Sequence, residues 1–177
     1  MNRTTLLLAY GDPGTRTLSQ RGFTLLELMV VVVIIAILAT LAVPGFQDLI
    51  RTNRVTSQSN ELVALINLAR SEAIRRSTPI EVDLTATADG WNADVSVLTP
   101  RTLIRTTSNV GVQLLGAPSD PLIFNSRGYL FDTVSNTWQA EVTFSLRHPG
   151  CSIDRQHRQL QILPTGQLNG QNAEGGC

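Results

Sequence analysis

The chain has 177 residues, contains no lysine, carries a formal net charge of zero, and is 42% hydrophobic. This length allows one ordinary domain plus an extension. Residues 1–22 carry three arginines and one aspartate, whereas residues 23–177 carry eleven arginines and thirteen acidic residues. A body with more acidic than basic residues is not a general nucleic-acid binder, so any anion site has to be a local patch.

An unbroken apolar run, residues 23–43, follows the basic N-terminal segment. Its length suits a helix that spans a bilayer, which takes about 20 apolar residues. The preceding arginines predict that residues 1–22 lie in the cytoplasm and that the chain after Pro44 lies outside. Pro44-Gly45 is expected to kink or end the helix. A cleaved secretory signal peptide is the alternative, but the sequence before Pro44 is a poor peptidase site.

One carboxylate, Glu27, lies four residues after Phe23 in this run, where the other polar side chains are Thr24 and Thr40. An acidic side chain at membrane depth costs about 2.5–3.5 kcal/mol and marks a functional site by default. The first turns of a helix favour an anion through the macrodipole. A cut between Gly22 and Phe23 would create an ammonium group that could pair with Glu27. A snorkelling surface glutamate is the alternative.

The segment RGFTLLELMVVVVIIAILATLAVPGF, residues 21–46, resembles the N-terminal segment of type IV pilins and pseudopilins. In that family a prepilin peptidase cuts after a glycine that precedes an aromatic residue. The new N-terminus is methylated, and a glutamate at the fifth mature position drives assembly. The resemblance implies cleavage between Gly22 and Phe23, N-methylation of Phe23 and an assembly role for Glu27. The leader is longer and less polar than usual, and a translation start downstream of Met1 is an alternative.

Residues 47–77 are predicted to continue the helix, which Thr78-Pro79 should end. Apolar residues at the helical period predict one apolar face, formed by Leu62, Ile66, Ala69 and Ala73 with Leu65 and Ile74 beside them. The stretch NELVALINLARSEAIRRSTPIEV, residues 60–82, resembles the GspH/FimT group of minor pilins and the minor pseudopilin of type II secretion. Asn53-Arg54 and Gly90-Trp91 favour the FimT/FimU type. The ARSEAI motif is expected to be structural.

From Pro79 the pattern changes to short segments of period two between turn residues, which predicts strands. Strands after one long helix predict an α+β fold, with a mostly antiparallel sheet packed on the helix. The resemblance implies the type IV pilin fold. The expected strands are residues 80–84, 91–98, 102–107, 122–124, 129–131, 141–146 and 160–163, with turns at 89–90, 126–128 and 165–166.

The predicted organisation has four parts. A prepilin leader covers residues 1–22, and the apolar transmembrane or fibre-core half of the helix covers residues 23–43. The amphipathic half of the helix covers residues 44–77, and a β-rich globular domain covers residues 78–177.

Two cysteines, Cys151 and Cys177, lie near the C-terminal end of the printed sequence. An even count in an exported chain favours a disulfide between them. The alternative is a metal site that uses both cysteines with His148 and His157, although this spacing matches no common zinc pattern. No motif of a catalytic nucleophile or a P-loop is found, so we expect neither an enzyme nor a cofactor.

Three arginines gather in RHPGCSIDRQHRQLQ, residues 147–161, and arginine forks suit phosphates. FimT-type minor pilins of naturally competent bacteria bind DNA through an arginine-containing motif that follows a glycine. At the similar place this chain has Gly166-Gln167-Leu168-Asn169, which contains no arginine. Arg155 and Arg158 could substitute for it, and solvated surface arginines are the alternative.

The expected function is that of a minor pilin that primes a type IV pilus and is incorporated near its tip. The alternatives are a DNA-binding minor pilin for natural transformation and a minor pseudopilin of type II secretion. Expected partners are the prepilin peptidase, other major and minor pilins, the inner membrane before assembly and, in the first alternative, DNA. The expected location is a single-pass inner-membrane protein with a periplasmic C-terminal domain, which then enters a pilus or pseudopilus.

Overall fold

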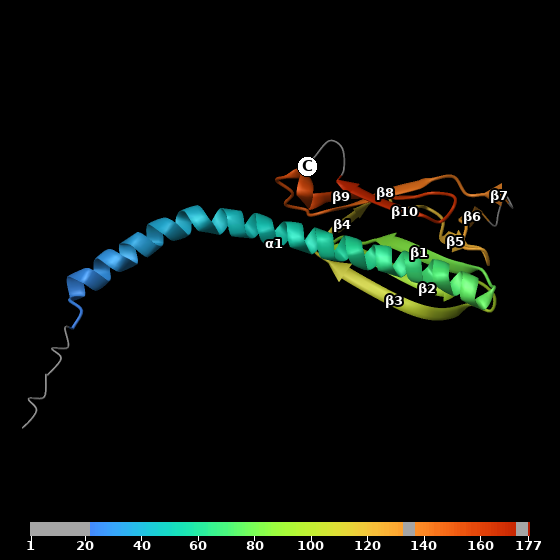
Figure 1. The fold of residues 1–177 in the computed structure, drawn as a ribbon, viewed down its shortest axis with the longest axis horizontal. Helices are drawn as coiled ribbons and strands as arrows, with labels where there is room; N and C mark the ends of the chain where they lie inside the picture. The colour runs from blue at the N-terminus through green and yellow to red at the C-terminus, as the bar shows by residue number, and fades with distance from the viewer. Residues whose placement is uncertain (1–21, 133–136, 173–176) are drawn as a thin grey trace, which may run out of the picture. The chain divides into compact units, whose positions relative to one another are not determined.

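The computed structural model describes residues 22–132, 137–172 and 177. The chain divides into two compact units, Met1–Leu41 and Ala42–Cys177. One long helix, α1, is followed by ten strands and a short 3-10 helix, η1, in the described residues (Figure 1).

Helix α1 runs from Leu25 to Arg76, and Pro44 lies inside it. Of the two alternatives for Pro44-Gly45, a kink or a helix end, the helix end is therefore wrong, and the helix continues beyond residue 47 as the sequence predicts. A proline inside a helix costs about 3 kcal/mol because it removes one backbone hydrogen bond and crowds the preceding turn. Ending the helix would instead leave up to four carbonyls and four N–H groups without partners in an apolar segment, which costs more.

The C-terminal end of α1 lies where the sequence predicts it. Ser77 adopts a positive φ of 51°. The N–H of Thr78 donates to the carbonyl of Ala73 at 3.3 Å, and the N–H of Ser77 donates to the carbonyl of Ile74 at 3.3 Å. This pair of bonds is a Schellman motif, in which the left-handed residue turns the chain out of the helix. Pro79 follows and cannot continue the helix.

The first sheet contains four strands in the order β3-β2-β1-β5, and all its pairs are antiparallel. Its register places Val82 opposite Val95 and Leu84 opposite Ala93, so buried side chains share one face. In Figure 1 the C-terminal part of α1 lies along this sheet. The strands are β1 (Ile80–Ala86), β2 (Gly90–Val97), β3 (Thr102–Val110) and β5 (Leu122–Phe124).

The second sheet has the order β10-β9-β8-β4 and is also antiparallel. Phe144 of β8 lies opposite Leu160 of β9, and both are buried. Its strands are β4 (Gln113–Leu115), β8 (Val142–Arg147), β9 (His157–Ile162) and β10 (Leu168–Asn172). A small ladder joins β6 (Phe131–Asp132) to β7 (Thr137–Trp138), and η1 covers Asp154–Gln156.

The α+β fold with antiparallel sheets on a long helix is confirmed. All seven predicted strand segments overlap an observed strand, but the segment 129–131 forms only a bridge between Leu130 and Phe124 before β6 begins. Strands β4, β7 and β10 were not predicted, because short or polar segments such as LNGQN show no alternation of apolar residues.

One hydrophobic core joins α1 to both sheets. Leu62, Ile66, Ala69 and Ala73 are all fully buried, and Leu65 beside them is buried too, so this part of the predicted helix face is confirmed. Ile74 near the end of the helix is 50% exposed, so the prediction is wrong for that residue. The same cluster contains Trp91 of β2, Phe124 of β5 and Phe144 of β8, among others. One face of α1 is therefore part of the hydrophobic core of the domain.

A polar contact crosses this core. The indole N–H of Trp91 donates to Oε1 of Gln58 at 3.0 Å, and Nε2 of Gln58 donates to the carbonyl of Val110 at 2.9 Å. Trp91 is fully buried and Gln58 is 8% exposed. Buried polar groups need such partners, so one side chain of α1 satisfies two groups of the first sheet at once.

We predict that Gln58→Ala destabilises the domain by about 2 kcal/mol, because it leaves a buried indole N–H and a carbonyl unpaired. Chemical unfolding followed by tryptophan fluorescence measures this loss. Asn60→Ala, an exposed position on the same helix, is the matched control and should change stability little. Equal stability of the two variants would contradict the assigned role of Gln58.

Candidate processing and assembly site

The predicted cleavage point lies just before α1. Gly22, Phe23 and Thr24 have no regular secondary structure, and the Phe23 side chain is 82% exposed. A Cβ added to Gly22 would meet nothing within 4 Å, so packing inside the chain does not require glycine there. An exposed, irregular peptide suits recognition by a protease. The rest of the predicted leader lies outside the described residues.

Thr24 caps the helix, a role that the sequence reasoning missed. Its hydroxyl oxygen accepts a hydrogen bond from the backbone N–H of Glu27 at 3.1 Å, and its carbonyl accepts one from Leu28 at 3.2 Å. A threonine followed three residues later by glutamate is the capping-box pattern, and the T-x-x-E spacing was the available signal. Glu27 therefore stands in the first turn, where the helix dipole favours a negative charge.

The apolar part of α1 has no cover within its own unit. Every residue from 22 to 47 is exposed. An 18-residue segment of α1 has a mean hydropathy of 2.9, and none of it is buried. The helix is therefore long and apolar enough to cross a membrane. An apolar surface on every side of a helix requires lipid or other apolar helices around it.

Glu27 is the one charged group in this apolar stretch. The other polar side chains are satisfied locally, because Thr24 serves the cap and the Thr40 hydroxyl donates to the carbonyl of Ile37 at 2.7 Å. None of the ion pairs between described residues includes Glu27. Its carboxylate is thus open to a cation from outside the described chain.

A second set of contacts anchors the C-terminal end of the chain. Cys151 and Cys177 form a disulfide with their Cα atoms 5.5 Å apart, so the predicted pairing is confirmed. In the chain-entropy model a loop of this size is worth about 3 kcal/mol. Because the two sulfurs bond to each other, the alternative metal site with His148 and His157 is wrong: it would need free thiolates. No cluster of three metal-ligating side chains occurs among the described residues.

The disulfide-linked segment is also held on α1 by Asp48. Oδ1 of Asp48 accepts hydrogen bonds from the Ser152 hydroxyl at 2.9 Å and from Nε2 of Gln156 at 3.2 Å. Arg51 donates to the carbonyl of Gly150 at 3.1 Å. The bonds from Ser152 and Gln156, with a smaller effect of Arg51, lower the pKa of Asp48. Asp48 therefore stays ionised at neutral pH, and its hydrogen bonds hold the disulfide-linked segment against α1.

His148 lies close to these contacts. Burial lowers the pKa of His148 below its usual value, and the charges of Arg51 and Arg54 lower it further. Its Nδ1 accepts the N–H of Gly150 at 3.0 Å. The imidazole is thus mostly neutral at physiological pH, and it adds little positive charge to the predicted arginine patch.

The arginines proposed for DNA lie on different elements. Arg155 is exposed in η1, whereas Arg158 is half-buried on β9 opposite Leu146. Because side chains alternate along a strand, Arg158 shares the face of the buried Leu160. The two guanidinium groups therefore do not form one continuous surface on a single strand face. DNA binding through Arg155 and Arg158 stays a prediction.

Two family models match the chain. The model described as Type II transport protein GspH matches residues 58–166, more than half of the chain. The model described as the prokaryotic N-terminal methylation motif matches residues 17–43 and thus includes Gly22, Phe23 and Glu27. This motif implies processing by a prepilin peptidase, and its apolar helix is typical of pilins anchored in the inner membrane before assembly.

Curated relatives share the N-terminal part. The type IV major alpha-pilin of Moraxella bovis is 42% identical over 62 residues, which cover 35% of this chain and 39% of that protein. A fimbrial protein of Pseudomonas aeruginosa is 43% identical over 67 residues, which cover 34% of this chain and 44% of that protein. The chain thus spans about two fifths of the length of these relatives.

A solved structure shares the fold. The crystal structure of the type IV minor pilin FimU of Pseudomonas aeruginosa matches with a TM-score of 0.55 and 22% identity, over 71% of this chain and 93% of that chain. The exposed apolar helix, the domain packed on its second half and both family models agree. The chain belongs to the GspH family of type IV pilins and pseudopilins, which are structural subunits and not enzymes.

Proposed function

We propose that this chain is a minor pilin that primes a type IV pilus and lies near its tip. The observation that carries the proposal is the fully exposed apolar part of α1, headed by the carboxylate of Glu27, which forms no ion pair with another described residue. The fold shared with the minor pilin FimU supports a minor subunit. The match of the methylation motif supports maturation at the Gly22–Phe23 bond.

The proposed mechanism has two stages. Before cleavage the apolar part of α1 lies in the inner membrane, with the domain from residue 44 onward in the periplasm. The peptidase then cuts after Gly22, and Phe23 gains a methylated ammonium group. That ammonium of one subunit meets the Glu27 carboxylate of a neighbour as the helices pack side by side. In apolar surroundings such a pair attracts more strongly than in water, which sets the register between subunits.

A minor pseudopilin of type II secretion is the second candidate. The description of the family model, Type II transport protein GspH, favours it. Both candidates would use the same cleavage and the same helix packing, so the described geometry is compatible with each. The two candidates differ in what is lost when the subunit is missing, which is pilus assembly for the first and type II secretion for the second.

We predict that Glu27→Gln leaves cleavage intact but prevents incorporation into fibres. Glutamine can still serve the capping box with Thr24, because that pattern accepts glutamate or glutamine. It cannot carry the charge, and breaking a buried ion pair costs about 3–5 kcal/mol, which corresponds to more than about a hundredfold loss in association. Immunoblots of sheared fibres and of membranes measure incorporation and cleavage separately.

Two further variants separate the cap from the charge. Thr24→Val removes the cap but keeps the carboxylate, so it should reduce incorporation far less than Glu27→Gln does. Glu27→Asp keeps the charge on a shorter side chain and should restore part of the incorporation. Normal amounts of the Glu27→Gln protein in sheared fibres would overturn the proposed ion pair.

We further predict that deletion of this subunit reduces surface piliation and twitching motility, while secretion of exoproteins stays normal. Twitching zones, fibre yield and the exoprotein content of the culture medium measure these outcomes in one strain. Complementation with the unchanged chain is the control. Loss of secretion with normal twitching would assign the subunit to the pseudopilus instead.

A further inference from the structure

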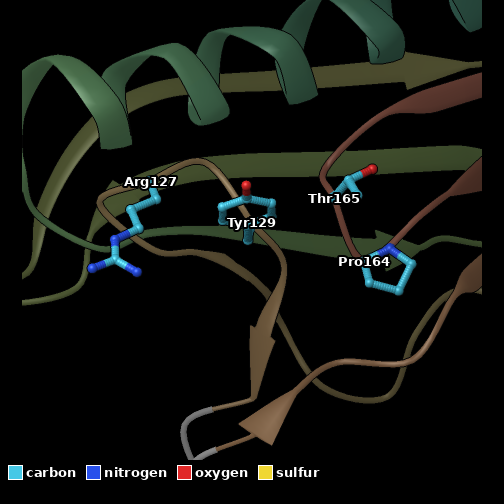
Figure 2. Close-up of a pocket in the computed structure, with 4 residues that line it drawn as sticks. All are labelled: Arg127, Tyr129, Pro164 and Thr165. Carbon is cyan, nitrogen blue, oxygen red and sulfur yellow. The ribbon is translucent and has the colours of Figure 1, made fainter.

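A hollow of about 330 Å³ lies between two turns of the β-rich domain. Figure 2 shows its four lining residues, with Arg127 and Tyr129 on one turn and Pro164 and Thr165 on the other. Its volume is at the lower end of the range of ligand pockets, which starts at about 300 Å³. The hollow can therefore hold a group about as large as one aromatic side chain.

The first turn is held by Asn125. Its side-chain oxygen accepts the N–H of Arg127 at 2.9 Å and the N–H of Tyr129 at 3.1 Å. Its own N–H donates to the carbonyl of Tyr129 at 3.0 Å. These bonds fix the backbone of both lining residues of this turn before any ligand is present.

The second turn is tied to the first. The N–H of Leu130 donates to the carbonyl of Pro164 at 3.0 Å, and the N–H of Gly166 donates to Leu163 at 2.8 Å. Gly128 and Gly166 both have a positive φ, of 78° and 75°. A Cβ on Gly166 would overlap the carbonyl oxygen of Gly128, so the two turns approach as closely as glycine allows.

Arg70 of α1 lies against both turns. Its Nε donates to the carbonyl of Gly128 at 3.0 Å. A Cβ on Gly128 would stand 3.2 Å from Arg70 Nε, and one on Gly166 would stand 3.0 Å from the same atom. The arginine of the ARSEAI motif is thus a positioning residue. The hollow is built by three segments that are distant in sequence and is pre-organised.

The lining combines apolar surface with positive charge. The ring of Tyr129 and Pro164 offer flat apolar contacts, and Tyr129 is 39% exposed. Arg127 is exposed at the same hollow. None of the ion pairs between described residues includes Arg70 or Arg127. An apolar wall next to a guanidinium that forms no ion pair with another described residue suits a flat apolar group that stands beside a carboxylate.

We propose that this hollow is a docking site for a peptide segment of a neighbouring subunit, in which an aromatic side chain enters the hollow and an adjacent carboxylate pairs with Arg127. The inference rests on the proposed function, since an assembling subunit presents its domain to its neighbours. A segment with one aromatic ring and one carboxylate matches the apolar surface of Tyr129 and Pro164 and the guanidinium of Arg127.

The test uses the full chain in detergent micelles, labelled with ¹⁵N, and three short peptides. The peptides are acetyl-Phe-Glu-amide, its neutral isostere acetyl-Phe-Gln-amide, and acetyl-Ala-Glu-amide. We expect saturable shifts of the amide signals of Tyr129 and Thr165 with the first peptide. The neutral peptide should bind about three- to fivefold more weakly, as expected for loss of an exposed ion pair. The alanine peptide should shift these signals least, because it leaves the hollow empty.

Arg127→Gln should make the first two peptides bind equally, whereas Arg105→Gln, on β3, is the matched control and should change nothing. Arg127 is exposed, so its substitution should leave the remaining spectrum unchanged. Equal binding of the two phenylalanine peptides to the unchanged chain, or the absence of saturable shifts at Tyr129 and Thr165, would overturn the proposal. Glu27→Gln should not affect peptide binding, so failure here leaves the assembly mechanism through α1 untouched.

Discussion

The structure depends on one continuous helix whose surface changes along its length. Up to residue 47 the side chains of α1 are exposed, and from Val55 onward one face of the helix is buried against the two sheets. A helix that is apolar on one face needs one packed layer, which this chain supplies itself. A helix that is apolar on every side needs a surrounding that a single chain does not contain. In the proposed mechanism this difference explains why the chain passes through a membrane stage and an assembled stage.

The charge of Glu27 at the start of α1, which forms no ion pair with another described residue, makes that surrounding specific. Lipid or any apolar helix would cover valine and isoleucine side chains, but the carboxylate of Glu27 needs a cation or hydrogen-bond donors if it is to stay ionised in such a place. In the proposed mechanism the peptidase creates that cation on Phe23. The capping pattern with Thr24 lets the helix begin correctly before and after the cut. Cleavage, register and helix packing then follow from two residues four positions apart.

Local patterns predicted the parts of the fold that depend on local sequence. The buried stripe with Leu62 and Ile66, the helix end before Pro79 and most strands follow from apolar periodicity and turn residues. Gly22, Phe23 and Glu27 were singled out because their spacing is a linear motif, and their roles stay predictions. Two contacts were not predictable, since each joins residues far apart in sequence. They are the contact of Arg70 with two turns and the hydrogen bond from Ser152 to Asp48. The sequence left open whether Pro44 kinks or ends the helix, because a local rule for proline competes there with the cost of unpaired backbone groups.

The most direct test of the account is the mass of this subunit as it occurs in sheared fibres. The protein should be recovered from fibres purified in detergent, and its intact mass and N-terminal peptide determined by mass spectrometry. The account predicts a chain that begins at Phe23 and carries one additional methyl group on its N-terminal nitrogen. Recovery from fibres of a chain that retains residues before Phe23, or that begins after the apolar run, would contradict it.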